Sequence, residues 1–256
     1  MKALLSLAIY YWNSRKGEGS EEHGNAIKFL RAYYGMGFRE AVLELTGSGA
    51  EKNIFVPPPA TLELPPRPFD FSDIELAPDM ERVTDYLTNT RGLSRQLVDT
   101  LIADRRLFQE AEKNNAIFPI YEQHKTVGAE IVGTMPQQRF KGIKTGSKYG
   151  CGYSLSFGEE TAYALFFESA IDLLSFIELS RMRGKTLEGC CLTSMMGLKP
   201  NIVEHTMQDL DGAQPFLCVD NDEAGANFIR QMGLKARLPN PDFKDWNDWL
   251  RAIRQN

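Results

Sequence analysis

Cysteine and histidine are scarce in this chain of 256 residues, which contains four cysteines and three histidines. No two cysteines have the C-x-x-C spacing, and His124 and His205 show no partner pattern. Because a structural zinc site needs four nitrogen or sulfur ligands, we expect no zinc. Three of the cysteines lie in or beside apolar, strand-like runs, which is typical of buried free thiols in a reducing compartment, so we expect a cytoplasmic protein. The cysteines are Cys151, Cys190, Cys191 and Cys218.

The chain also lacks an excess of positive charge and a long hydrophobic run. Its formal net charge is −5, so any binding to nucleic acid needs a local basic patch rather than the whole surface. The apolar stretch at residues 3–12 is too short to span a bilayer, and it is not followed by the small-residue cleavage site of a secretory signal. We therefore expect no membrane partner.

Acidic residues are absent from residues 131–158, although this stretch contains the basic residues Arg139, Lys141, Lys144 and Lys148. Four glycines in its second half would let the backbone approach a polyanion closely. This local asymmetry predicts a patch that binds the phosphates of a nucleotide or of a template strand. The alternative is a solvated basic hairpin without a ligand.

Proline clusters divide a chain whose composition is otherwise that of an ordinary globular protein, with 43% hydrophobic and 25% charged residues. Prolines at positions 57–59, 65, 66 and 68 predict an extended linker over residues 51–78. A small module is expected over residues 1–50, with a strand at 5–11 and helices at 25–34 and 38–45. After the linker we expect a helical and β-rich basic subdomain over residues 79–158 and an α/β domain over residues 159–256.

Acidic side chains follow two apolar, strand-like runs in this last domain. Residues 162–167 are followed by Glu168 and a helical pattern, and residues 216–219 are followed by Asp220, Asp222 and another helical pattern. Because parallel strands end at a common edge of a sheet, the three carboxylates are expected to converge there. Oxygen ligands of this kind suit Mg²⁺ or Mn²⁺. The alternative is structural, with Asp222 capping the second helix and the other two acids in solvated turns.

These two acidic motifs resemble those of the Toprim domain, the metal-binding domain of DnaG-type primases, topoisomerases and some nucleases. They read FESAID at residues 167–172 and VDNDEAG at residues 219–225. The resemblance is strongest over roughly the last hundred residues. It implies an α/β fold (α+β for the whole chain) with a Rossmann-like parallel sheet at the C-terminus. It also implies that Glu168, Asp220 and Asp222 are catalytic metal ligands.

Shorter stretches upstream resemble other parts of DnaG-type primases. The stretches that are similar to the second half of the primase zinc ribbon are residues 11–12, 24–30 and 37–42. However, Trp12 and Arg15 stand where that family has paired cysteines, and His23 alone cannot hold zinc, so the metal has been lost or the chain begins partway through that module. The stretches that are similar to the helical and basic strand-rich parts of the primase core are residues 86–94, 118–120 and 142–146.

The primase resemblance implies an activity and further residue roles. It implies metal-assisted phosphoryl transfer that makes short RNA primers on a single-stranded DNA template, with Mg²⁺ or Mn²⁺ as cofactor and ribonucleotides as substrates. Glu168 would bind the metal or act as a general acid or base. Lys244 and Asp245 match a Lys–Asp pair of the family, so Asp245 would be a further metal ligand and Lys244 a nucleotide contact. The alternative is that Asp245 caps the last helix.

Two other functions remain open from the sequence. A Toprim nuclease would use the same carboxylates for hydrolysis. A non-catalytic nucleic-acid-binding module would keep the fold without the activity, and the missing zinc ligands favour this alternative because zinc ribbons often hold template. The likeness to primases also suggests a replicative helicase as a partner and a mobile element as the origin of the gene.

Overall fold

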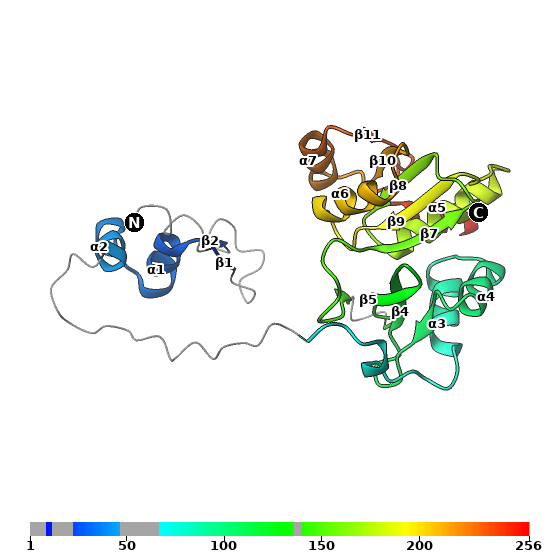
Figure 1. Ribbon diagram of the computed structural model, residues 1–256, viewed down its shortest axis with the longest axis horizontal. Helices are drawn as coiled ribbons and strands as arrows, with labels where there is room; N and C mark the ends of the chain where they lie inside the picture. Colours follow the sequence, from blue (N-terminus) through cyan, green and yellow to red (C-terminus); the bar gives the residue numbers. More distant parts are fainter. Residues whose placement is uncertain (1–8, 12–22, 47–66, 136–139, 256) are drawn as a thin grey trace. The chain divides into compact units, whose positions relative to one another are not determined.

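The computed structural model describes residues 9–11, 23–46, 67–135 and 140–255 (Figure 1). The chain divides into two compact units, Met1–Glu63 and Leu64–Asn256. The proline-rich stretch up to residue 66 and positions 12 and 15, where cysteines were expected and not found, lie outside the described residues. No helix of the described residues has both the length and the apolar composition needed to cross a bilayer.

The first unit is a small module of two strands and two helices in its described part. Strand β1 (Ile9–Tyr11) pairs with β2 (His23–Asn25) in antiparallel fashion, and α1 (Ala26–Tyr34) and α2 (Phe38–Thr46) follow. Both predicted helices are found within one residue of their expected ends. Gly35, with φ of 69°, follows α1 directly, as expected for a helix that ends at a left-handed residue.

A four-stranded antiparallel sheet, in the order β3-β4-β5-β6, occupies the first half of the second unit. Its strands are β3 (Phe108–Gln109), β4 (Ala116–Glu122), β5 (Lys125–Val132) and β6 (Lys141–Ile143). Gln123 and His124 form the turn between β4 and β5, and their φ angles are 46° and 68°. Two consecutive residues with positive φ give a two-residue turn the twist that matches its flanking strands. Strands β4 and β5 thus form a hairpin with a two-residue turn.

Short helices precede this sheet and share its core. They are η2 (Phe71–Asp73), α3 (Glu81–Asp85), the π-helical turn η3 (Tyr86–Thr90) and α4 (Arg95–Ala103). Ser94 caps α4, since its side-chain oxygen accepts a hydrogen bond from the N–H of Leu97 at 3.2 Å, as the sequence predicts. Val83, Leu87 and Val98 are fully buried on the apolar side of these helices.

Five strands form a second sheet in the order β11-β10-β8-β9-β7. They are β7 (Tyr153–Phe157), β8 (Tyr163–Phe167), β9 (Cys190–Ser194), β10 (Gln214–Cys218) and β11 (Lys235–Ala236). The first four strands in that order are parallel, and β7 is antiparallel to β9 at one edge. The chain passes from β8 to β9 on one side of β8 and then to β10 on the other side. Open α/β sheets place their ligands at such a switch point, beyond the carboxyl ends of the strands.

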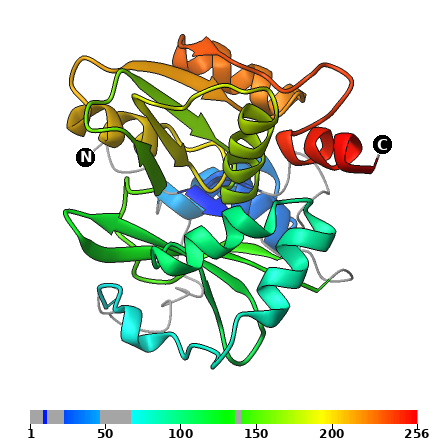
Figure 2. The same cartoon turned by 90° about the vertical axis from the view of Figure 1, so that its right-hand side faces the viewer.

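Helices cover both faces of this second sheet (Figures 1 and 2). They are α5 (Ala170–Met182), α6 (Pro200–Asp209), α7 (Glu223–Met232) and α8 (Trp246–Gln255). Ile202 of α6 and Phe228 of α7 pack with Phe166 and Leu217 on one face. On the opposite face, α5 and α8 pack around Phe167. The predicted α/β fold with a parallel sheet in the C-terminal part is confirmed.

The last strand is shorter than the predicted strand at residues 234–238, because only Lys235–Ala236 pair regularly with β10. The N–H of Arg237 still donates to the carbonyl of Leu217 at 2.8 Å. Pro239 and Pro241 follow closely, and proline has no N–H to extend the ladder. The edge of the sheet therefore ends early at this strand.

One continuous hydrophobic core joins the antiparallel sheet to the parallel sheet. It includes Phe118 of β4, Val132 of β5, Tyr153 of β7 and Leu165 of β8. The rings of Phe118 and Tyr153 lie 5.2 Å apart and meet edge to face, so side chains from the two sheets are in direct contact. The boundary predicted between residues 158 and 159 stays a prediction about sequence modules, since the core is continuous across it.

Candidate metal and phosphate site

Glu168 and Asp220 lie side by side because they follow neighbouring strands in register. Phe167 ends β8, Cys218 ends β10, and these two residues are paired directly across the ladder. The backbone N–H of Asp220 donates a hydrogen bond to Oε1 of Glu168 at 3.1 Å. The structure thus brings together two of the carboxylates that the sequence predicts to converge at this sheet edge.

Asp222 takes part in both the predicted cluster and its structural alternative. Its Oδ1 accepts the N–H of Gly225 at 2.9 Å, which caps α7, while its Oδ2 lies 3.5 Å from Nζ of Lys244. Lys244 also lies 3.9 Å from Oδ2 of Asp220, so one ammonium group faces both aspartates. Gly225 is required here, since a Cβ at this position would lie 2.3 Å from the carbonyl oxygen of Asp220.

Asn221, between the two aspartates, holds the segment that carries Lys244. Its side-chain amide donates to the carbonyls of Pro239, Asn240 and Phe243 at 3.3, 3.2 and 2.9 Å. Its backbone N–H donates to the carbonyl of Lys244 at 2.7 Å. This amide therefore ties the loop before α8 to the end of β10, which explains why Lys244 faces the acids.

Asp245 occupies the capping position that the sequence offers as the alternative to a metal ligand. Its Oδ1 accepts the N–H of Asp248 at 2.7 Å in the first turn of α8. It still contributes to the field of the cluster, because its charge is among the influences that raise the pKa of Asp220. Its role as a metal ligand stays a prediction.

The surroundings of Asp220 disfavour a negative charge in the absence of a cation. Burial, followed by repulsion from Asp172, Glu168 and Asp245, raises the pKa of Asp220 to about 8. Burial also raises the pKa of Glu168, and the charge of Asp222 adds to that effect. The Oδ1 atom of Asp220 is buried and has no hydrogen-bond partner among the described residues. A bound cation would satisfy that oxygen and remove the repulsion.

The donor set of this cluster fits a hard divalent cation. Glu168 and Asp220 offer carboxylate oxygens, Asp222 offers the oxygen that does not cap α7, and no sulfur or imidazole is among them. Oxygen-only ligands suit Mg²⁺ or Mn²⁺ rather than zinc. The residues present therefore fit the cofactor that the sequence predicts.

A cavity of about 230 Å³ places a basic side chain beside these acids. Its lining includes Glu168 and Asp220 from the parallel sheet and Lys141 from β6 of the antiparallel sheet. Gly197 lines it as well, and its N–H donates to the carbonyl of Glu168 at 2.7 Å. A cation and two carboxylates that line the same cavity can hold a phosphate group and a metal ion at adjacent positions.

The other predicted phosphate-binding residues are not part of this cavity. Lys148 binds Glu122 instead, with its Nζ at 2.7 Å from Oε1 and 2.5 Å from Oε2. Lys144 follows β6 and is half-buried, and Arg139 lies outside the described residues. Of the predicted basic patch, Lys141 is the member that lines the acidic cavity within the part of the chain that the structure describes.

Two buried acids beside the site were missed by the sequence analysis. Glu130 on β5 is 2% exposed; its carboxylate accepts the N–H of Ala170 at 3.1 Å and the hydroxyl of Ser194 at 2.7 Å. Asp172 is 4% exposed and is hydrogen-bonded to Ser169 at the start of α5. Burial raises the pKa of both acids. The signal for Glu130 was an acid inside an apolar run, and the signal for Asp172 was a Ser-x-x-Asp capping pattern.

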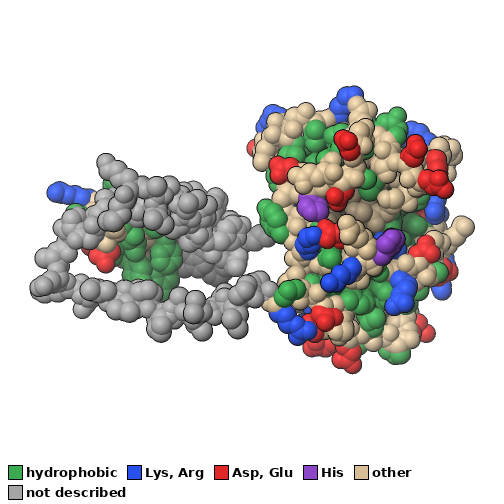
Figure 3. Space-filling model, in the orientation of Figure 1, with side chains coloured by type: hydrophobic (Ala, Val, Ile, Leu, Met, Phe, Trp, Pro, Cys, Tyr) green, Lys and Arg blue, Asp and Glu red, His purple; other side chains and the backbone are tan. Residues whose placement is uncertain are grey.

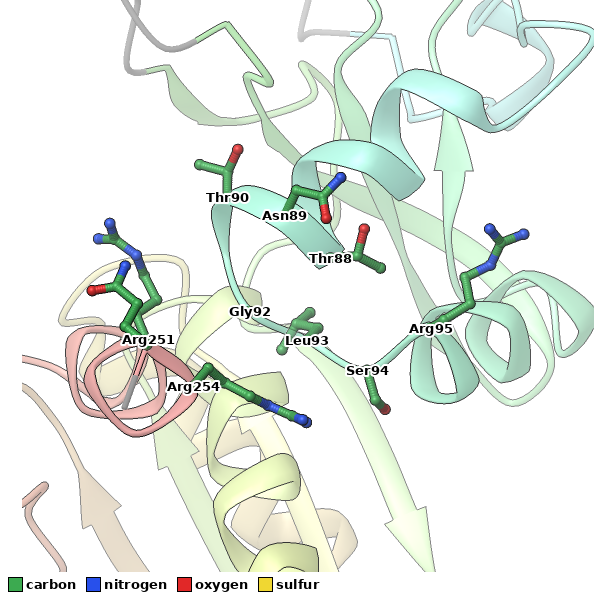
Figure 4. A pocket seen from close by; sticks show the side chains of 10 residues that line it. Thr88, Asn89, Thr90, Gly92, Leu93, Ser94, Arg95, Arg251 and Arg254 are labelled. Atoms are coloured by element: carbon green, nitrogen blue, oxygen red, sulfur yellow. The ribbon is translucent and has the colours of Figure 1, made fainter.

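A larger cavity of about 780 Å³ lies elsewhere in the second unit, and none of these acids lines it (Figure 4). Figure 4 shows Arg251 and Arg254 extending from α8 on one side of this cavity and Arg95 on α4 across from them. Each arginine already forms an ion pair with an acid. The nitrogen–oxygen distance is 3.7 Å between Arg251 and Asp248, 2.8 Å between Arg254 and Glu178, and 2.7 Å between Arg95 and Asp99. Volume alone therefore does not select the functional site here.

The fold and the acidic edge of the C-terminal part are those of a Toprim-like domain. The family model described as Toprim-like matches residues 165–250, and a model described as a protein of unknown function (DUF3991) matches residues 85–161. Residues 165–250 thus form a Toprim-like domain, which confirms the predicted resemblance. The chain is also 28% identical over 239 residues to an uncharacterised protein of Bacillus anthracis. That match covers 87% of this chain and 65% of the relative, so the chain spans less than two thirds of the relative's length.

Two solved structures from bacteriophage T7 are similar to this chain at low identity. One is the primase fragment of the primase-helicase protein, with a TM-score of 0.47, 13% identity and coverage of 82% of this chain and 81% of that chain. The other is the lagging-strand DNA polymerase with primase domains of two gp4 subunits bound to an RNA/DNA hybrid and dTTP. Its TM-score is 0.46 at 15% identity, and the match covers 73% of this chain and 92% of that chain.

Proposed function

We propose that this protein is a primase-like nucleotidyltransferase that joins ribonucleotides on single-stranded DNA by metal-assisted phosphoryl transfer. One observation carries the proposal: Glu168 and Asp220 lie side by side at the switch point of a Toprim-like sheet, with Lys141 in the same cavity. The buried Oδ1 of Asp220 has no hydrogen-bond partner within the described part of the chain. The Toprim-like domain supports a function related to nucleic acid. The primer synthesis itself, a helicase partner, a mobile-element origin and a cytoplasmic location are the finer parts of the proposal.

The side chains in and beside the cavity would have different roles in such a reaction. Glu168, Asp220 and the free oxygen of Asp222 would hold Mg²⁺, which supplies charge neutralisation of a triphosphate and makes a 3′-hydroxyl easier to activate. Lys141 lines the same cavity and would bind a phosphate there. Lys244 faces both aspartates and would exchange that contact for a phosphate of the nucleotide. Glu168 accepts a backbone N–H and has a raised pKa, so it is also suited to hold or release a proton.

Incubation of the protein with single-stranded DNA, labelled ribonucleotides and Mg²⁺ tests this proposal. Labelled oligomers that depend on both template and metal are the expected result. Shortened DNA would favour a Toprim nuclease that uses the same carboxylates, and a mobility shift without either product would favour a non-catalytic binding module.

The substitution Asp220→Ala is expected to lower the rate of oligomer formation by about 100-fold or more, because it removes a ligand that stabilises developing charge. Asp211→Ala, at an exposed acid in the turn before β10, is the matched control and should keep the rate of the unaltered protein. Normal polymerisation by the Asp220→Ala protein would refute the metal site.

A further inference from the structure

A second cluster of ligand-type side chains lies outside the acidic edge. Glu122 ends β4, Cys151 precedes β7, and His205 lies on α6. Oε1 of Glu122 is 3.7 Å from Sγ of Cys151 and 3.9 Å from Nε2 of His205, and one donor atom from each residue lies within 4.8 Å of the other two. The interpretation of His205 as a histidine without partners is therefore wrong.

We propose that Glu122, Cys151 and His205 form a binding site for a divalent transition metal, with Zn²⁺ as the best fit. A carboxylate, a thiolate and an imidazole are the three kinds of protein ligand that Zn²⁺ accepts, whereas Mg²⁺ avoids sulfur. Metal–ligand bonds of about 2.0–2.3 Å put the donor atoms of a tetrahedral site roughly 3.3–3.8 Å apart. The spacing of 3.7 Å lies inside that range and the spacing of 3.9 Å lies just outside it. The third spacing is at most 4.8 Å, so the cluster must close by about 1 Å at most to hold the metal ion.

The second nitrogen of His205 is oriented in the way metal-bound histidines usually are. Its Nδ1 lies 3.9 Å from Oδ2 of Asp209, one turn further along α6. A carboxylate behind a ligating imidazole fixes its tautomer and increases its basicity. Gly150 contributes space, because its φ is 81° and a Cβ there would lie 3.2 Å from the ring of His205. The loop before β7 is thus shaped to let the imidazole lie against it.

A cavity of about 410 Å³ gives this site room for a fourth ligand. Its lining includes Glu122, Cys151, His205 and Asp209. Figure 3 shows histidine side chains at the surface beside acidic and basic ones. The side chain of His205 is 32% exposed and that of Glu122 is 28% exposed, so solvent reaches this cluster. Three protein ligands with an open position are typical of sites in which water or a substrate completes the coordination.

Lys148 is the competitor of the proposed metal ion. Its ammonium group contacts both carboxylate oxygens of Glu122, at 2.7 and 2.5 Å, and stabilises that carboxylate in the metal-free protein. A metal ion that takes Oε1 would leave the ammonium only Oε2. Removal of the ammonium should therefore strengthen metal binding, an effect that a purely structural Glu122–Lys148 pair would not produce.

Titration of the metal-stripped protein with Zn²⁺ by calorimetry, and with Co²⁺ by absorption spectroscopy, tests the site. With excess Mg²⁺ present to occupy the acidic site, we expect one equivalent of each metal and a sulfur-to-cobalt charge-transfer band. The band should vanish in Cys151→Ser, and Zn²⁺ affinity should fall by at least tenfold in His205→Gln and by roughly 10- to 100-fold in Asp209→Asn. Lys148→Met should raise the affinity.

Two control substitutions establish that the metal binds at this cluster. Cys190→Ser alters a thiol that does not line the cavity, so it should keep the cobalt band. Asp220→Ala should keep Zn²⁺ binding, which makes the outcome independent of the proposed polymerase activity. Absence of stoichiometric binding, or a cobalt band that survives in Cys151→Ser, would overturn the proposal. Circular dichroism of His205→Gln, a substitution on a half-exposed helix position, checks that a loss does not reflect unfolding.

Discussion

Asp220 is a carboxylate whose surroundings oppose its ionisation. It is 13% exposed and has acidic neighbours, and the side chain of Lys244, whose Nζ lies 3.9 Å from Oδ2 of Asp220, is 59% exposed. A contact with so exposed an ammonium is screened by water and offsets little of the cost of burial. Near neutral pH the metal-free protein therefore holds Asp220 mostly in its protonated form, and a divalent cation would favour the ionised form.

The stability of the metal-free protein should consequently fall as the pH rises. The folded pKa of Asp220 is about 8 and its ordinary value is 3.8, so the folded state binds a proton that the unfolded state has already released. The contribution of Asp220 to stability is complete below about pH 4 and is lost as the pH rises through about 8. Glu168 and Asp172 act in the same direction. Thermal unfolding in the presence of a chelator, at pH values between about 4 and 8, measures how steeply the Tm falls with pH.

Asp220→Asn should flatten this slope, because an amide does not ionise, and Asp211→Asn should leave it unchanged. Mg²⁺ should raise the Tm of the unaltered protein most strongly near pH 8, where it binds the ionised site by mass action. A Tm that rises steadily with pH in chelator would contradict the assigned environment of Asp220.

At the scale of the element, the position of β6 determines which of the predicted lysines lines the acidic cavity. Lys141 is on that strand and lines the acidic cavity, whereas Lys148 lies beyond it and is bound to Glu122. Lys141→Ala should weaken the affinity for a ribonucleoside triphosphate about tenfold, since a charge-assisted contact of this kind is worth about 1.4 kcal/mol or more.

Fluorescence anisotropy with a labelled nucleotide at fixed salt measures this effect. Lys148→Ala should change the affinity less than Lys141→Ala, because its ammonium is already engaged. Lys185→Ala, at an exposed lysine after α5, is the control for a general loss of positive charge. Equal effects of all three substitutions would mean that nucleotide binding does not use the cavity.

The elements themselves were predictable where local signals were strong. Apolar runs and turn residues indicate the strands at 116–122 and 163–167. The capping residue Asp222 indicates the start of the helix at 223–232, and Ser94 indicates the start of α4 in the same way. The pairing of Glu168 with Asp220 followed from the rule that parallel strands share an edge. The roles of Glu130, His205 and Lys148 did not follow, because each contacts residues 40 or more positions away or on other elements. Such contacts arise from packing, which the spacing of residues in the chain does not encode.

At the scale of the whole second unit, Glu130 connects the two sheets. It lies on β5 of the antiparallel sheet, yet its partners are Ala170 at the start of α5 and Ser194 at the end of β9. Loss of its carboxylate would leave two buried donors without an acceptor. Glu130→Ala should therefore lower the free energy of unfolding by about 2–4 kcal/mol.

For a protein of this size, the loss corresponds to a fall in Tm of very roughly 5–15 °C, which calorimetry would detect. Glu130→Gln keeps one acceptor and should recover part of the loss. Glu159→Ala, at an exposed acid after β7, should leave the Tm within about 1–2 °C of the unaltered protein. A Glu130→Ala protein as stable as the Glu159→Ala control would show that the two sheets do not depend on this carboxylate.

Lys141 lines one cavity with Glu168 and Asp220, and it belongs to a different sheet from the strands that these two acids follow. The spacing between the basic and the acidic side chains consequently depends on how the two sheets are packed, through contacts such as that between Phe118 and Tyr153. A change of one methylene group deep inside the molecule would widen or narrow the slot that a triphosphate must enter. Discrimination among substrates would then be governed by the same apolar side chains that keep the protein folded.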